Sequence, residues 1–163
     1  MAAILDIVYK PIGIIHSPFH KLEGMPIQPT SDRSERGTVE IYSEYVDGLK
    51  DLDGFSHVYL LYHLHKTNAV KLQVIPFLDT ELHGIFATRA PSRPNPVGLS
   101  LVEILHIDGN MIYVDRIDVL DETPLLDIKP YIPEFEEPEA VRIGWLEQAK
   151  AKIRSQKSDS RFL

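Results

Sequence analysis

A stiff, proline-rich loop from Gly84 to Ser100 carries the side chains best suited to hold an anionic ligand. Arg89 and Arg93 have planar guanidinium groups that can bind a carboxylate or phosphate through paired hydrogen bonds, and Asn95 adds an amide. The loop backbone is largely pre-set, because proline fixes its own φ and pushes the preceding residue toward an extended conformation. The alternative is a connection that only protects a sheet edge, with arginines facing water. The prolines of this loop are Pro91, Pro94 and Pro96.

Three histidines in the segment 55–67 could bind a metal or a ligand. The segment is dense in aromatic and aliphatic residues, which predicts a buried strand, and the spacing of His57, His63 and His65 would place all three on one face of it. Only His63 and His65, ~7 Å apart along a strand, are close enough to share one ion. We therefore expect no metal, and we favour structural or ligand-binding histidines.

The composition limits the remaining chemistry. The 163 residues include no cysteine, which excludes disulfides, thiolate catalysis and cysteine-based zinc sites. A net charge of −7 argues against nucleic-acid binding by bulk electrostatics, although a local basic patch stays open. No stretch is apolar enough to span a bilayer, and Met1 to Tyr9 lacks the features of a signal peptide. We expect a cytoplasmic protein that uses neither membrane nor metal.

The elements that must position these residues are mainly strands. The expected strands are 4–17, 37–42, 55–67, 70–78, 82–87, 97–107 and 111–114, with a hairpin turn at 108–110. They follow one another too closely for helical crossovers, so we predict a single antiparallel β-barrel, because closure limits exposed edges. The pattern also predicts a short helix at 45–52, an irregular loop at 18–36 and an amphipathic C-terminal helix at about 139–157. We expect one domain, 1–163, with its core at about 8–135.

A set of motifs then resembles a known family. They are Phe-Ser-His at 55–57, His-Lys at 65–66, the whole stretch 84–100, and Asp-Glu-Thr-Pro-Leu-Leu-Asp-Ile-Lys-Pro-Tyr at 121–131. Together, over about Lys10 to Tyr131, they resemble the TsaA-like family, also called TrmO. The resemblance implies a β-barrel that forms a homodimer and binds S-adenosylmethionine. Characterised members methylate the exocyclic nitrogen of threonylcarbamoyladenosine at position 37 of tRNA, which implies tRNA as the substrate.

The resemblance also implies which residues hold the cofactor. Arg89 or Lys66 would bind its carboxylate, Asp121 would face its ammonium and sulfonium, and the adenine would lie against Leu99 and Pro29. The full set of implied cofactor contacts is Gln28, Pro29, Thr30, His65, Lys66, Arg89, Leu99, Asp121, Glu122, Thr123 and Pro124.

Catalytic and substrate contacts follow from side-chain chemistry within the same motifs. Asp127 is a candidate to accept the proton of the attacking nitrogen, and Lys129 and Tyr131 are candidates to orient the modified base; each is equally open to a structural role. Arg93 and Asn95 are candidates for RNA contact.

The chain departs from the family pattern in ways that keep other functions open. It has Pro-Ile-Gln-Pro at 26–29 where members typically carry Pro-Arg-Gln-Pro, and Glu122 where the family frequently has glycine. It ends after the expected helix, whereas longer members continue into a domain thought to help hold tRNA. The alternatives are a regulatory or interaction module that binds S-adenosylmethionine without turnover, and a methyltransferase for a small molecule or protein.

Overall fold

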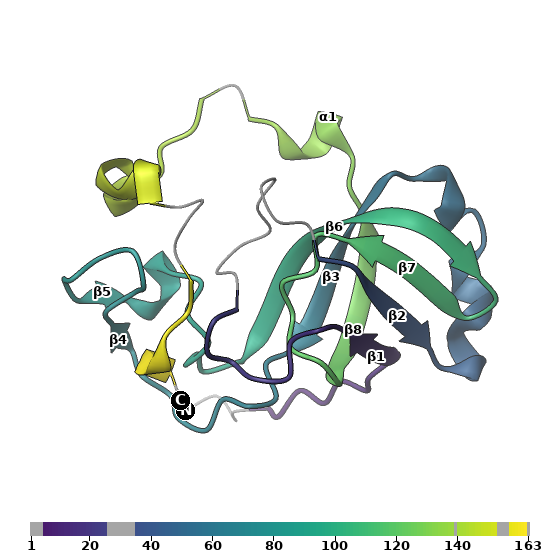
Figure 1. Cartoon of the computed structure of the whole chain (residues 1–163), viewed down its shortest axis with the longest axis horizontal. Coiled ribbons are helices and arrows are strands. Elements are labelled where there is room, and N and C mark those ends of the chain that lie inside the picture. Colours follow the sequence, from purple (N-terminus) through teal and green to yellow (C-terminus); the bar gives the residue numbers. More distant parts are fainter. Residues whose placement is uncertain (1–4, 26–34, 139, 153–156, 163) are drawn as a thin grey trace.

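The centre of the molecule is a closed antiparallel barrel (Figure 1). The structure is a computed structural model that describes residues 5–25, 35–138, 140–152 and 157–162. In that part of the chain the barrel strands run in the order β1-β2-β7-β6-β3-β8, and the predicted barrel is confirmed. The strands are β1 (Gly13–His16), β2 (Gly37–Ile41), β3 (His57–His63), β6 (Val97–Asp108), β7 (Met111–Asp115) and β8 (Thr123–Pro130).

Strict alternation along β3 separates the inside of the barrel from its outside. Val58, Leu60 and Tyr62 are buried, whereas the residues between them face outward. The pairing of β3 with β8 shifts its register between Leu61 and Tyr62, opposite Leu125. This bulge lies near the end of β3 that leads into the site described below. The buried core around Leu60 consists of Ile15, Val39, Ile41, Val58, Tyr62, Val102, Ile112, Val114, Ile117, Val119 and Leu125.

Some expected strands are much shorter than the sequence pattern suggested. The 4–17 strand is reduced to β1, because Pro11 cannot donate to a ladder and precedes the pairing with β2 and β8. The 70–78 and 82–87 strands form only a ribbon of β4 (Gln73–Val74) and β5 (His83–Gly84), outside the barrel. The short 3₁₀ helix η3 (Ile85–Ala87) follows. The helix expected at 45–52 is present as the 3₁₀ helices η1 (Ser43–Leu49) and η2 (Leu52–Gly54).

The described helices are short, and none of them is long and apolar enough to cross a membrane. Beyond β8 they are α1 (Pro133–Glu136), η4 (Gly144–Lys152) and η5 (Ser160–Phe162). The amphipathic helix expected at 139–157 was therefore wrong over the described residues. Gly144 adopts a left-handed φ of +58°, which an α-helix cannot continue through, and Pro138 precedes it.

The C-terminal segment, defined here as residues 144–152 and 157–162, returns to pack against the ribbon (Figure 1). The Phe162 ring meets the edge of Phe77 with 5.1 Å between ring centroids, and Arg161 Nη1 donates to the Pro76 carbonyl at 2.7 Å. Ser158 forms backbone hydrogen bonds with both Gly24 and Met25. The segment thus joins the ribbon to the loop that follows β1.

Replacing Glu122 with glycine is expected to stabilise the protein. Glu122 immediately precedes β8 with φ +60°, a region that penalises any residue with a Cβ. Relief of this strain should raise the free energy of unfolding by about 1 kcal/mol, as measured by urea denaturation. Glu103→Gly in the extended strand β6 is the matched control and should destabilise. A loss of stability in Glu122→Gly equal to that in the control would contradict the strain.

Candidate functional site

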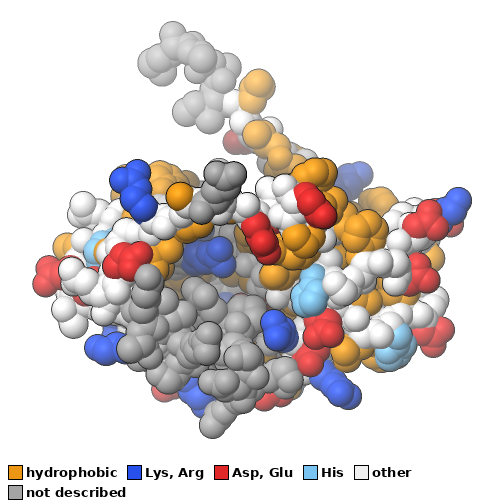
Figure 2. All heavy atoms as spheres, turned by 90° about the horizontal axis from the view of Figure 1, so that it is seen from above, with side chains coloured by type: hydrophobic (Ala, Val, Ile, Leu, Met, Phe, Trp, Pro, Cys, Tyr) orange, Lys and Arg blue, Asp and Glu red, His pale blue; other side chains and the backbone are white. Residues whose placement is uncertain are grey.

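A pocket of about 460 Å³ lies where the barrel, the ribbon and the C-terminal segment meet. Its lining is predominantly apolar, and Arg89 supplies a cation from the stiff loop. Other contributions include Leu64 from the end of the barrel, Phe77 near the ribbon, Pro91 from the loop, and Trp145 and Phe162 from the C-terminal segment. Figure 2 shows this face hollowed, with basic side chains within and beside the hollow.

A smaller pocket of about 80 Å³ adjoins it; its exposed surface is mostly apolar, although several polar residues contribute to its lining. The two pockets share Leu22, Met25, Leu64 and Pro91 as walls, so they lie side by side. The polar side chains that line the smaller pocket are Tyr62, His65, Lys66, Thr67, Asp118 and Thr123. Of the residues implied as cofactor contacts, the structure thus gathers His65, Lys66, Arg89 and Thr123 around one composite site.

His65 is positioned by Thr123 at the start of β8. The Thr123 hydroxyl donates to the Leu120 carbonyl at 2.7 Å, and its oxygen lies 3.3 Å from His65 Nδ1. Burial lowers the pKa of His65, and the positive charge of Lys66 lowers it further. The imidazole is therefore neutral at pH 7, where it can exchange hydrogen bonds with a ligand without carrying a charge.

Arg93 braces the stiff loop from within. Its Nη1 donates to the carbonyls of Thr88 at 2.8 Å and Ile85 at 3.1 Å, and the guanidinium lies 5.8 Å from the centre of the Phe86 ring. The loop is consequently held by this side chain as well as by its prolines. Asn95 is exposed. The RNA contacts of Arg93 and Asn95 stay predictions, and for Arg93 the structure shows a bracing role that the sequence did not indicate.

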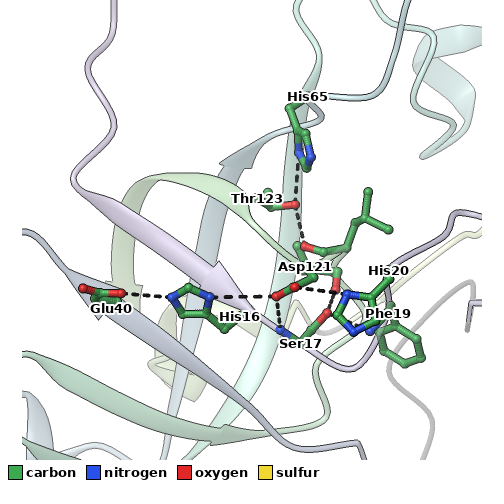
Figure 3. A network of polar contacts seen from close by, with 10 residues as sticks. His16, Ser17, Phe19, His20, Glu40, His65, Asp121 and Thr123 are labelled. Atoms are coloured by element: carbon green, nitrogen blue, oxygen red, sulfur yellow. Dashed lines mark hydrogen bonds and ion pairs between the residues drawn. The ribbon is translucent and has the colours of Figure 1, made fainter.

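Asp121 lies in a separate polar network beside the pockets (Figure 3). Its carboxylate accepts a hydrogen bond from the Ser17 backbone N–H at 3.0 Å, and His20 Nδ1 lies 3.2 Å from its second oxygen. His16 Nδ1 is 3.9 Å away, and the other nitrogen of His16 is 3.0 Å from Glu40. Asp121 therefore ties the chain after β1 to the start of β8, and it lines neither pocket.

The catalytic candidates from the sequence lie on the outer side of the barrel. Asp127 and Lys129 pair with each other at 2.9 Å, and the Tyr131 hydroxyl donates to Glu137 at 3.2 Å. Leu99 is also on this outer side, with 46% of its surface exposed. None of these residues lines either pocket, nor do Glu122 and Pro124. Gln28, Pro29 and Thr30 lie outside the described residues.

The three histidines do not share a face as the spacing suggested. β3 ends at His63, and the chain turns before His65, which reaches Thr123 instead. His57 hydrogen-bonds Ser56 and meets the Tyr131 ring edge-on at the opposite end of the strand. Among the described residues, no group of three or more His, Cys, Asp or Glu side chains is placed to hold a metal ion.

Sequence reasoning missed a buried chain of hydroxyls that ends at Asp118. The Tyr62 hydroxyl lies 2.9 Å from Ser100 Oγ, which donates to Asp118 Oδ1 at 2.5 Å. Tyr62 also packs its ring on Gly98, its partner across the β3–β6 pairing. A signal was present: Ser100 occupies an inward position of β6, where the alternation otherwise places apolar residues.

With this geometry established, the comparisons with known proteins identify the family. Residues 14–137 match the family model of the tRNA-methyltransferase O N-terminal domain. The chain belongs to this family. A probable S-adenosyl-L-methionine-binding protein of Pyrococcus abyssi is 49% identical over 99% of this chain and 88% of its own length. The human tRNA (adenine(37)-N6)-methyltransferase is 34% identical over 83% of this chain and 32% of its own length.

Solved structures agree with the TrmO family assignment. The crystal structure of TrmO from Pseudomonas aeruginosa matches with a TM-score of 0.73 at 34% identity. The match covers 86% of this chain and 63% of that one. The chain thus spans under two thirds of this TrmO and about a third of the human relative. The TrmO family match ends at residue 137, so Trp145 and Phe162 wall the pocket from beyond it.

Proposed function

We propose that this chain binds S-adenosylmethionine in the composite site and transfers its methyl group to N6 of threonylcarbamoyladenosine at position 37 of tRNA. The observation that carries the proposal is the convergence of His65, Lys66, Arg89 and Thr123 on two adjoining pockets, although these residues are widely separated in the sequence. The name of the Pyrococcus relative supports S-adenosylmethionine as the cofactor, and the name of the human relative supports tRNA as the substrate.

The residues present fit the cofactor. A pocket of about 460 Å³ lies within the ~300–1,000 Å³ common for small-molecule sites. Arg89 and Lys66 offer cations to a carboxylate, and the apolar walls with Trp145 suit a purine ring. The bound cofactor supplies an already activated methyl group. The chain's own residues therefore have to orient the acceptor nitrogen and exclude water.

Several parts of the proposal stay predictions. Cofactor contacts at Gln28, Pro29, Thr30, Leu99, Asp121, Glu122 and Pro124 belong to it, as do roles for Asp127, Lys129 and Tyr131. The exposed Leu99 on the outer face of β6 fits contact with a second subunit, which supports the proposed homodimer. The one-domain organisation, the cytoplasmic location and the absence of a metal also stay predictions.

A cofactor-binding module without turnover is the second candidate. It is favoured by the Pyrococcus relative, whose name specifies binding only and of which this chain covers 88% of the length. A methyltransferase for a small molecule or protein would use the same pockets. Identifying the methylated substrate, if there is one, distinguishes the tRNA methyltransferase, the binding module and the methyltransferase for a small molecule or protein.

A tritiated methyl-transfer assay tests the function. We expect label in tRNA that carries the threonylcarbamoyl group and none in matched tRNA without it, because the pocket must recognise the modified nitrogen. Cofactor affinity is measured in parallel by calorimetry. Binding of the cofactor with label in neither tRNA would overturn the tRNA methyltransferase and leave the module and the methyltransferase for a small molecule or protein. Label in both tRNAs would replace the modified nucleoside with unmodified adenosine as the substrate.

A further inference from the structure

The chain from Tyr62 through Ser100 to Asp118 has a defined direction. Ser100 has one hydroxyl hydrogen, which it donates to Asp118 Oδ1 at 2.5 Å. The 2.9 Å contact with Tyr62 must therefore be donated by the tyrosine hydroxyl. Two hydroxyls in series thus point their hydrogens toward one carboxylate, in the arrangement that stabilises its charged form. Tyr62 is 7% exposed and Ser100 is 3% exposed, so water competes little for these bonds.

The residue at the end of this chain, Asp118, belongs to the wall of the smaller pocket. Asp118 and Tyr62 both line that pocket, whose walls continue into the larger one. The carboxylate accepts one hydrogen bond from Ser100 at Oδ1 and another from the backbone N–H of Asp118 itself, and with two oxygens it still has lone pairs for a further donor. Asp118 therefore lies in the wall of the composite site proposed for the cofactor, beside the larger pocket.

Asp118 differs from Asp127 and Asp159 in having no contact cation among the described residues. Asp159 lines the larger pocket but pairs with Arg161 at 2.9 Å, and Asp127 pairs with Lys129 at 2.9 Å on the outer face. Within the described residues no Lys, Arg or His forms a contact ion pair with Asp118. Arg89 acts on it only at longer range. Burying a carboxylate without a contact cation costs stability, which a purely structural residue would not require.

The environment also sets the basicity of this group. Burial raises the pKa of Asp118 to about 6, although the hydrogen bond from Ser100 and the positive charge of Arg89 oppose the rise. Such a carboxylate is ionised at pH 7 and is a stronger base than an exposed aspartate. The nitrogen of a carbamoylated adenine is a weak nucleophile, because its lone pair is delocalised into the ring and the carbonyl. Removal of its proton during attack therefore matters.

We propose that Asp118 is the proton acceptor for the methylated nitrogen, with Ser100 and Tyr62 as its positioning residues. This inference rests on the proposed function. Methyl transfer forms an N–C bond, breaks the C–S bond with its electron pair kept by sulfur, and releases the N–H proton. Asp118 takes up that proton on its carboxylate and loses it to water after the product leaves.

The pH dependence of three variants and the wild type tests this role. Wild-type kcat/KM should rise with pH through about 6, as the carboxyl ionises. Asp118→Asn should lower kcat about 100-fold, within the range typical of lost general base catalysis. Ser100→Ala should move the inflection to higher pH, because it removes a hydrogen bond that stabilises the carboxylate. Tyr62→Phe should move it in the same direction by less.

Two measurements that need no turnover separate this inference from the proposed function. An infrared titration of the carboxyl bands should show a group with a pKa near 6 that is absent from Asp118→Asn and shifted upward in Ser100→Ala. Calorimetry should give cofactor affinity in Asp118→Asn within about threefold of wild type, and thermal unfolding should be no lower, because a buried charge has been removed.

The outcomes are distinct. A wild type that binds cofactor and methylates no tRNA defeats the proposed function, whereas an active wild type matched by Asp118→Asn defeats only the proton acceptor. Loss of cofactor affinity in Asp118→Asn would make the residue a cofactor ligand and overturn the inference. An infrared pKa at the ordinary aspartate value would overturn it even without turnover.

Discussion

Alanine at position 98 is expected to destabilise the protein by about 3 kcal/mol, through overpacking of the core and loss of a buried hydrogen bond. A Cβ on Gly98 would lie 2.1 Å from Cε2 and 2.5 Å from Cζ of Tyr62. Tyr62 is only 7% exposed, so its ring would have to be displaced within the barrel to make room for the new Cβ. Any displacement would pull its hydroxyl from Ser100 and leave both groups short of a partner. The free energy of unfolding in urea measures the effect.

Two further variants isolate the cause of this destabilisation. Gly84→Ala is the matched control, because a Cβ there meets nothing within 4 Å and the expected change is near zero. Combining Gly98→Ala with Tyr62→Leu should cost less than the sum of the single changes, since the smaller side chain makes room for the new Cβ. Strict additivity, or a Gly98→Ala protein as stable as wild type, would show that the ring is not confined as described.

Loss of the Arg89 side chain is expected to weaken binding of S-adenosylmethionine about 10- to 100-fold, as for a lost charge-assisted hydrogen bond. Arg89 is exposed to the larger pocket, where its guanidinium can meet the carboxylate of the cofactor. Arg89→Lys keeps the charge but loses the paired geometry, so its affinity should fall between those of Arg89→Ala and wild type. Isothermal calorimetry gives the dissociation constants directly.

Arg142→Ala serves as the control for general loss of positive charge. Arg142 is exposed and lines neither pocket, so its removal should leave cofactor affinity unchanged. Thermal unfolding of all three variants should match that of wild type, which would assign the effect to the site. Equal losses of affinity in Arg89→Ala and Arg142→Ala would place the cofactor elsewhere.

The barrel could be predicted from the sequence because most of its strands are marked by a pattern in neighbouring residues. Alternation in 37–42 marked β2, the density of aromatic and aliphatic residues in 55–67 marked β3, and Asp108-Gly109-Asn110 marked the turn that joins β6 to β7. The strands predicted at 70–78 and 82–87 were too long, because the apolar residues in 70–87 pack against the C-terminal segment and line the larger pocket. They do not form part of the barrel core. An apolar run alone does not distinguish these environments.

Site residues could be predicted where the chemistry of one side chain was enough to select it. They could not be predicted where the role depends on a contact between residues far apart in the sequence. Arg89 was selected for its chemistry on a stiff loop, and the structure places it in the larger pocket. The same reasoning could not distinguish Arg93, whose guanidinium turns back onto carbonyls of its own loop. Ser100 and Asp118 lie on opposite sides of the β6–β7 hairpin, and their meeting depends on its register, which shifts between Ile104 and His106 and could not be known from the turn alone.

Because the C-terminal segment forms one wall of the larger pocket, the time that a ligand stays bound can be set independently of the stability of the barrel. Ser158 is held by backbone hydrogen bonds to Gly24 and Met25, and Phe162 packs against Phe77 and the small cluster of Val74, Ile85 and Ala90. None of these partners belongs to a barrel strand, so breaking these contacts would open one wall of the larger pocket while the barrel strands stay paired. A small molecule can therefore exchange by local opening, whose free energy is far below that of global unfolding. How long it stays bound then depends on the segment, and the core can be as stable as the fold allows.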